Sequence, residues 1–175
     1  MFARLLLVVL AFAAYDILLA SEPAAPSKSP AELALTLSAP QLTVKAGGPM
    51  MLTVTVKNIS NRLIGVEAVR STTQEANYAV MVREEHGNEA RTTAYHRLLR
   101  GKPSPDDPVA IITNSEILWP LDPGKTTDDP IDLAKLYSLA PGVYSVQVER
   151  LFCSGLCKGG ETSVRSNILT ITVTP

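Results

Sequence analysis

Apolar and polar residues alternate with a period of two through much of this chain. In residues 51–57, Leu52, Val54 and Val56 share one face, whereas threonine and lysine side chains occupy the other. Such alternation is typical of a strand packed on one side. The strands that it predicts cover residues 33–44, broken at Pro40, and residues 51–57, 63–69, 78–83, 116–121, 143–150 and 169–173.

Turn residues separate these segments. Gly87 and Asn88 follow residues 78–83, so residues 89–94 are expected to return as a hairpin partner. No segment shows a sustained 3.6-residue stripe, and the helical candidates are single turns at residues 132–137 and 94–100. Seven or more short strands with irregular turns predict an all-β fold, an immunoglobulin-like antiparallel β-sandwich.

The predicted register divides the strand residues into a core face and an outer face. The residues that we expect to be more exposed are Thr53, Thr55, Ser145 and Gln147. The residues that we expect in a common core are Val54, Val80, Trp119, Val146 and Ile171. For Trp119, a sugar-stacking platform is the alternative to a core position.

Tyr144 follows a Pro141-Gly142 corner at the start of a late strand. A tyrosine at this place can bury its ring and direct its hydroxyl to nearby backbone, an arrangement known as a tyrosine corner. The sequence predicts this structural role, and ligand stacking is the alternative.

The N-terminus has the pattern of a secretory signal peptide. Arg4 provides a positive start, residues 5–14 are an unbroken apolar run, and small residues follow at Ala20 and Ser21. The run is too short to cross a bilayer. We expect a signal peptide at residues 1–20 and secreted or periplasmic localisation, with no stable membrane span after cleavage. A membrane-anchored N-terminus is the alternative.

The remainder of the chain is expected to be a spacer followed by one domain. Residues 21–31 are rich in proline, alanine and serine, which is typical of a disordered spacer. Residues 32–175 are long enough for a single domain with a proper core. The formal net charge of −1 gives no basis for a nucleic-acid partner.

Turn and strand motifs in this domain carry a family resemblance. The segments concerned are 54–60, 121–125, 131–133, 136–137 and 141–146. They resemble the immunoglobulin-like module at the N-terminus of deuterolysin-type secreted metalloproteases and, more loosely, bacterial proteinase inhibitors first named as intracellular. Deuterolysins hold zinc in a separate domain with a His-Glu-x-x-His helix, which this chain lacks, and its only histidines are His86 and His96. The resemblance therefore implies the accessory module without the enzyme, with no metal and no other cofactor.

Two cysteines lie four positions apart in the connection between the last two predicted strands. In an exported protein, the pair Cys153 and Cys157 predicts a disulfide that holds a loop shape, and metal or redox use is the alternative. The bridge would display Leu156 and Lys158 as possible partner contacts at the end of the sandwich.

Residues 92–108 form a second unusual segment, too long for a hairpin loop. Its basic residues are possible contacts with an anionic partner surface: His96, Arg97, Arg100 and Lys102. The alternative is a solvated loop in which Asp106 and Asp107 neutralise these charges.

Two further polar motifs have structural explanations as their first interpretation. Asp106-Asp107 and Asp128-Asp129 lie beside prolines and are expected to be turn residues rather than calcium ligands, because no calcium-loop spacing is present. Asn58-Ile59-Ser60 satisfies the glycosylation sequon.

These observations favour an exported, non-catalytic interaction module that binds a protein or cell-surface partner through end loops or edge strands. The alternative is a secreted proteinase inhibitor in which residues 97–108 occupy a protease cleft. No Ser-His-Asp or paired-carboxylate arrangement suggests an enzyme.

Overall fold

Ten β-strands and three short helices form the part of the chain that the computed structural model describes, residues 32–69, 74–108, 116–153 and 161–175. The predicted all-β class is confirmed. The strands are β1 (Leu33–Ser38), β2 (Thr43–Lys45), β3 (Met51–Asn58), β4 (Ile64–Val69), β5 (Ala79–Glu84), β6 (Glu116–Leu121), β7 (Thr126–Asp132), β8 (Gly142–Cys153), β9 (Glu161–Arg165) and β10 (Leu169–Thr174). The helices are η1 (Gln74–Asn77), α1 (Ala94–Leu99) and α2 (Leu133–Leu136).

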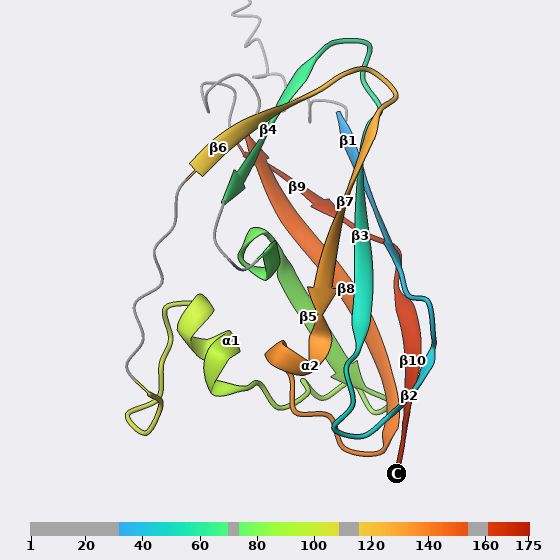
Figure 1. Cartoon of the computed structure of the whole chain (residues 1–175), viewed down its shortest axis with the longest axis vertical. Helices are drawn as coiled ribbons and strands as arrows, with labels where there is room; N and C mark the ends of the chain where they lie inside the picture. Colours follow the sequence, from blue (N-terminus) through green and yellow to red (C-terminus); the bar gives the residue numbers. More distant parts are fainter. Residues whose placement is uncertain (1–31, 70–73, 109–115, 154–160) are drawn as a thin grey trace, which may run out of the picture.

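The strands pair in three sheets. One has the order β1-β3-β7, and the second has the order β2-β10-β8-β5 with β9 also paired to β8. The third is a two-stranded pair of β4 and β6. The strand pairs are antiparallel except β2, which runs parallel to β10. Figure 1 shows β3 and β7 in front of β5 and β8, with β4 and β6 leaning away at the top of the molecule.

Inward side chains of the first two sheets meet in one hydrophobic core. Four of the five predicted core residues are at most 4% exposed: Val54, Val80, Val146 and Ile171. The residues predicted for the outer face are all more exposed than these: Thr53, Thr55, Ser145 and Gln147. The predicted register is therefore confirmed for β3, β5, β8 and β10, because a slip of one residue would exchange the two faces.

The first predicted strand divides between the two sheets at Pro40. Its first piece, β1, pairs with β3, and its second piece, β2, pairs with β10. Asn167 ties the sheets together, because its side chain accepts a hydrogen bond from the Leu37 N–H (2.8 Å) and donates one to the Leu37 carbonyl (3.0 Å). The free edge of β1 is thus partly satisfied by one amide side chain.

Strand β7 was not predicted, and the assignment of Asp128 and Asp129 to a turn is wrong. Both residues lie within β7, where Asp129 is opposite Val54 of β3 and Asp128 is opposite Thr55. The segment Thr126–Asp132 is polar and contains a proline, so no apolar alternation marks it. It is a strand because its backbone pairs with β3 at the edge of the sheet, where proline is tolerated.

Both predicted helical turns are present, and the predicted hairpin is shorter than expected. Thr93 and Asp132 cap α1 and α2 by accepting backbone N–H groups. After the turn at Gly87, the returning chain pairs with β5 only around Glu89 and Ala90. The chain then leaves β5 to enter α1.

The predicted tyrosine corner is confirmed. Tyr144 is 5% exposed, and its hydroxyl donates a 2.9 Å hydrogen bond to the carbonyl of Ala140 across the Pro141-Gly142 corner. We expect Tyr144→Phe to lower the free energy of unfolding by about 1 kcal/mol, the net value of one hydrogen bond, in a urea titration. An unchanged unfolding midpoint would contradict this role.

The predicted signal peptide at residues 1–20 and spacer at residues 21–31 lie outside the described residues. Within the described ranges, no helix is both long and apolar enough to cross a membrane.

Candidate functional site

The basic residues of the 92–108 segment mostly contact the protein itself. His96 lies in α1 and is 6% exposed, so its assignment to a partner-contact loop is wrong. It is buried because α1 places the imidazole of His96 against the ring of Tyr137, with 4.9 Å between the two ring centroids. Arg100, at the end of this helix, donates a hydrogen bond to the carbonyl of Tyr78.

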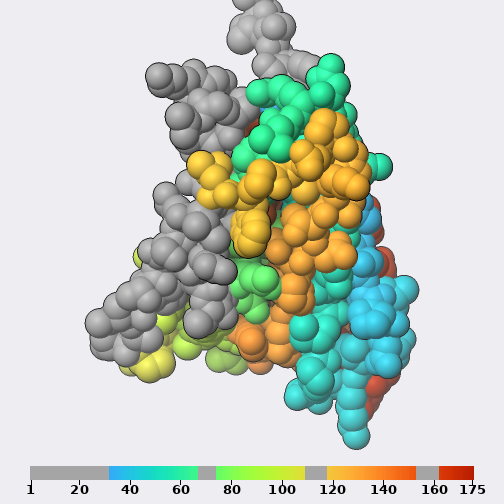
Figure 2. All heavy atoms as spheres, turned by 45° about the horizontal axis from the view of Figure 1, so that its top comes forward, coloured from blue at the N-terminus to red at the C-terminus, as the bar shows by residue number. Residues whose placement is uncertain are grey.

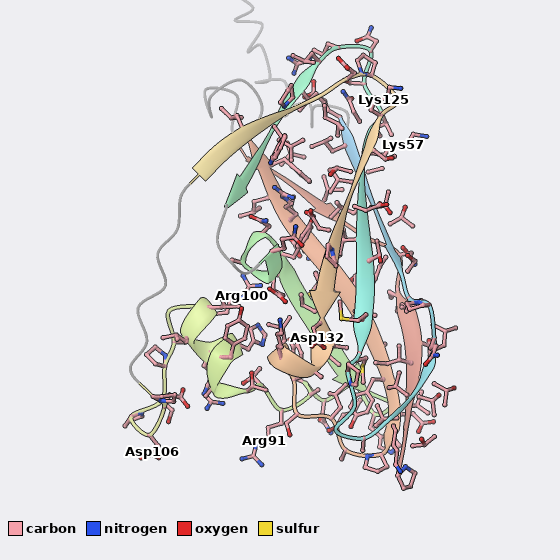
Figure 3. All side chains as sticks on the ribbon, in the orientation of Figure 1. Lys57, Arg91, Arg100, Asp106, Lys125 and Asp132 are labelled. Atoms are coloured by element: carbon pink, nitrogen blue, oxygen red, sulfur yellow. The ribbon has the colours of Figure 1, made fainter. Side chains whose placement is uncertain are left out.

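Arg97 forms an ion pair with Asp107, as the neutralised-loop interpretation predicted. Its Nε lies 2.8 Å from Oδ2 of Asp107, and this hydrogen bond is the main reason that the pKa of Asp107 falls to about 2. Asp107 also closes the predicted turn, since its N–H donates to the Ser104 carbonyl (3.0 Å). Lys102 and Asp106 remain exposed, and Figure 3 shows Asp106 at the outer end of the segment.

The predicted disulfide cannot be placed from the described part of the chain. Cys153 is the last residue of β8, and Cys157 lies outside the described residues, as do Leu156 and Lys158. The bridge between Cys153 and Cys157 stays a prediction, and so do the two contact residues in its loop.

A buried charged cluster joins the two main sheets. Arg150 of β8 is 4% exposed, and its guanidinium carbon lies 5.1 Å from the ring centroid of Tyr78 and 5.0 Å from that of Phe152. Its Nη1 is 3.1 Å from the Tyr78 hydroxyl and 3.7 Å from the carboxylate of Asp129 in β7. The Tyr78 hydroxyl donates to the same carboxylate, and burial is the main cause that raises its pKa. The guanidinium, the hydroxyl and the carboxylate of this cluster all contact one another, which indicates a structural role in holding the two sheets together.

Strands β4 and β6 form a two-stranded ribbon that pairs with neither main sheet. We call this pair the ribbon. Figure 2 turns this end of the molecule toward the viewer and shows the ribbon at its surface. Ile64 and Leu121 lie opposite each other at its base and are buried, whereas Leu118 and Trp119 near its middle are 59% and 56% exposed.

The core position predicted for Trp119 is therefore wrong. The alternation assigned its face correctly, since Trp119 lies opposite the buried Val66. Trp119 is exposed because β6 pairs only with β4 among the described strands and belongs to neither main sheet, so no second sheet covers this side chain. Exposed apolar side chains that occur singly need no explanation, but clustered ones indicate a contact surface.

Large exposed apolar residues gather at the ribbon. Of the nine found among the described residues, four lie on it or in the connection that leads to it: Ile59, Leu63, Leu118 and Trp119. Leu118 lies across the neighbouring strand, because a Cβ on Gly65 would come within 2.7 Å of its Cδ2. Glycine at this position leaves room for Leu118 over β4, so the outer face of the ribbon carries an exposed apolar side chain as well.

Asn58, at the end of β3, holds the base of the ribbon. Its side chain is fully buried, and its amide nitrogen donates to the carbonyls of Leu121 (2.7 Å) and Arg62 (2.8 Å). Its side-chain oxygen accepts from the N–H of Ser60 (2.9 Å). Asn58 thereby joins the two chain segments that leave the main sheet, and Figure 3 shows Lys57 and Lys125 at this end of the molecule. In the folded domain the sequon nitrogen is not accessible for glycosylation.

Sequence reasoning missed the ribbon as a surface, although one observation marks it. Residues 117–121 read Ile-Leu-Trp-Pro-Leu, with no polar residue between the apolar ones. A strand with one solvated face alternates, so an uninterrupted run predicts a strand with two apolar faces. No comparable sequence pattern predicts the structural role of Asn58.

The described residues contain no group of three or more His, Cys, Asp or Glu side chains that could hold a metal ion. Models of known protein families give no match to this chain, and a comparison with curated proteins found no similar one.

Proposed function

We propose that this protein is an exported, non-catalytic interaction module that binds a partner protein through the ribbon. The observation that carries the proposal is the exposure of Leu118 and Trp119, which lie on opposite faces of β6 and are both more than half exposed, on a strand that pairs along one edge within the described residues. Tryptophan is among the residues that contribute most to protein interfaces. A strand that still has unpaired backbone groups can also accept an added strand from a partner.

Export and the finer fold belong to the same proposal. The order β1-β3-β7 facing β10-β8-β5 corresponds to strands A, B and E facing G, F and C of immunoglobulin-like sandwiches. The divided first strand and the tyrosine corner at the start of β8 agree with that assignment. The pattern of residues 1–20 supports export.

A protein partner fits the ribbon better than a sugar. A sugar platform needs hydrogen-bonding groups around the aromatic ring, whereas the described neighbours of Trp119 on β6 are Leu118, Pro120 and Leu121. An apolar strand with backbone groups at its edge matches an extended protein segment with alternating side chains.

We expect Trp119→Ala to weaken partner binding by about 2 kcal/mol, roughly thirtyfold in Kd, with little change in the melting temperature. Leu42→Ser is the matched control, because Leu42 is 50% exposed and lies away from the ribbon next to β2. Proteins captured from the exported fraction by the wild type and by Leu42→Ser, and lost with Trp119→Ala, are then purified and titrated. A partner that binds both variants equally would reject the ribbon as the contact surface.

The single tryptophan of the chain gives a second measurement. Fluorescence of the isolated protein should be that of a solvated indole, readily quenched by iodide, and a purified partner should shift it to shorter wavelength and reduce the quenching. Protection from iodide in the isolated protein that increases with its concentration would indicate self-association instead.

A secreted proteinase inhibitor is the second candidate, and one observation favours it. The ion pair between Arg97 and Asp107 holds together the two ends of a segment in which Lys102, Pro103 and Asp106 are exposed. Inhibitors present such constrained loops to proteases, since a rigid loop loses little entropy on binding. A panel of proteases tests this candidate: inhibition that disappears with Asp107→Ala would support it, and no inhibition at micromolar concentration would exclude it for the proteases tested.

A further inference from the structure

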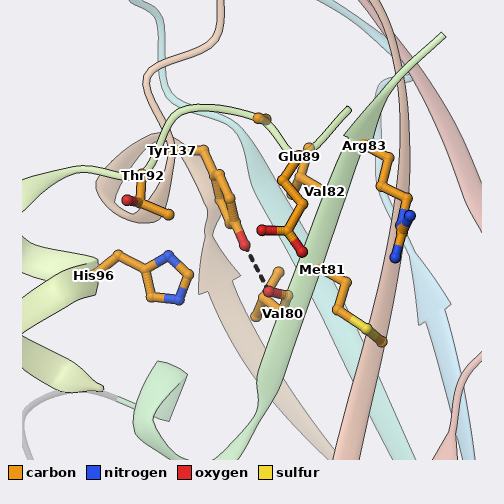
Figure 4. A pocket seen from close by; sticks show the side chains of 9 residues that line it. Val80, Met81, Val82, Arg83, Glu89, Thr92, His96 and Tyr137 are labelled. Carbon is orange, nitrogen blue, oxygen red and sulfur yellow. Dashed lines mark hydrogen bonds between the residues drawn. The ribbon is translucent and has the colours of Figure 1, made fainter. Parts of the chain in front are cut away.

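His96 lies between helix α1 and the rest of the domain. Figure 4 shows its imidazole directed toward Tyr137, beside Thr92. The two rings meet edge to face, with an interplanar angle of 63°. A pocket of about 200 Å³ adjoins them, lined mainly by β5 and by the chain that leads from Glu89 to α1.

The contacts of the imidazole favour its neutral form. The Nε of Arg100 lies 3.5 Å from Nε2 of His96, and a guanidinium can only donate. This long contact fits a neutral ring that carries its proton on Nδ1, with Nε2 as the acceptor. Nδ1 is buried and has no partner at ordinary hydrogen-bond distance.

Adding a proton reverses this contact. A protonated Nε2 would place an N–H donor against the N–H of Arg100, and two cations would lie side by side. Arg100 is also held by its hydrogen bond to the carbonyl of Tyr78, so it cannot turn away without losing that bond. Burial and then the charge of Arg100 lower the pKa of His96, while the carbonyl of Leu136 opposes the shift.

The other groups that face His96 do not supply a buried counter-charge. From β5 and the chain after it, Arg83 and Glu89 line the pocket with opposite charges, and both are exposed. Tyr137 supplies no charge at physiological pH, and burial raises its pKa further from this range, to about 12. Protonation of His96 is thus opposed by Arg100 of the same helix and only weakly favoured by Glu89, whose carboxylate is exposed to solvent.

Helix α1 depends on this docking. It has six residues, and isolated helices of that length are not stable in water. Besides His96, it is held by its cap Thr93, whose N–H donates to the Leu136 carbonyl (2.9 Å), by Arg100, and by Tyr95 and Leu99, which pack against the hydrophobic core while partly exposed. Loss of the His96 contact should therefore weaken the docking of the helix and leave the sheets intact.

We propose that His96 is an acid-operated latch, whose protonation releases α1 from Tyr137 and uncovers the adjoining face of β5. The neutral imidazole docks the helix through its contact with Tyr137. Arg100, at the end of the same helix, is anchored to the carbonyl of Tyr78, so an imidazolium at His96 would be repelled by a cation that is fixed in place. Stability from this contact is fully present above the ordinary histidine pKa of about 6.5 and is lost as pH falls from there to the lower pKa of the docked state.

Hydrogen exchange of the full chain, corrected for the intrinsic pH dependence of exchange, tests the latch. Between pH 7.5 and 5.5 the opening equilibrium of residues 94–99 should increase by about tenfold, the limit for one proton with an ordinary pKa of about 6.5 in the open state. Amides of β3 should keep their protection. Uniform opening of α1 and β3, or no change in α1, would overturn the proposal.

Three variants identify the titrating group. His96→Gln keeps an acceptor for Arg100 but cannot titrate, so its helix should stay docked at both pH values. Arg100→Gln keeps a donor and removes the cation, so the pH response should shrink. His86→Gln alters the one other histidine, which is exposed in a turn, and should leave the response as in the wild type. A pH response that persists in His96→Gln, or disappears in His86→Gln, would overturn the proposal. If His96→Gln fails to dock at pH 7.5, an NMR titration of His96 in the wild-type protein decides instead, and a pKa at or above about 6.5 would overturn it.

Discussion

Replacing Asp129 with alanine is expected to lower the free energy of unfolding by about 3 kcal/mol, which corresponds to a melting temperature roughly 10 °C lower. Asp129 supplies the carboxylate next to Arg150, whose side chain is 4% exposed between the rings of Tyr78 and Phe152. The variant leaves a buried guanidinium without that counter-charge and the Tyr78 hydroxyl without its acceptor. Removing one member of a buried pair costs more than the pair itself contributes, because the remaining charge stays out of water.

Asp128→Ala is the matched control for this prediction. Asp128 lies next to Asp129 on the same strand, but it is exposed and accepts a hydrogen bond from Thr55 (2.6 Å) at the surface. We expect a loss of less than about 1 kcal/mol. Urea titrations of both variants measure the difference, and equal losses would show that the cluster around Arg150 does not stabilise the fold.

Replacing Asn58 with alanine is expected to lower the free energy of unfolding by about 3 kcal/mol as well. The carbonyls of Leu121 and Arg62 would each lose the hydrogen bond that the Asn58 amide donates, and the N–H of Ser60 would lose its acceptor. Because these groups join the two segments that lead to the ribbon, partner binding should weaken in the same variant even under conditions where the domain remains folded.

Ser60→Ala provides the control and removes the same sequon. The Ser60 hydroxyl donates to Asn58 and also contacts the Arg62 carbonyl at a partly exposed position, so we expect a loss below about 1 kcal/mol. Thermal and urea unfolding of both variants check the prediction. A Ser60→Ala variant as unstable as Asn58→Ala would mean that the hydroxyl, and not the buried amide, holds this turn.

The fold was predicted best where two sheets cover each other. In β3 and β8 every second side chain enters the shared core, so period-two alternation follows directly from burial. The tyrosine corner was predicted for a similar reason, because the Pro141-Gly142 turn and Tyr144 are neighbours in sequence.

Prediction failed where a polar side chain occupies an inward position. Strand β7 contains Asp129 at a place where the alternation would require an apolar residue. Its carboxylate is stabilised there by Arg150 and Tyr78, which are both distant in sequence. The error for His96 is of the same kind, since six helical residues carry too little periodicity to show which side is buried.

The sequence by itself determined the all-β class, the register of the main strands, both helical turns and the Tyr144 corner, because each depends on residues that are close along the chain. Only the tertiary structure decided that Trp119 is exposed, that Asn58 and Asp129 are central to the packing, and that His96 meets Tyr137 and Arg100. The physical reason is that the alternation of apolar and polar residues indicates on which face of a strand a side chain lies. Whether that face is exposed depends on whether another part of the chain covers it.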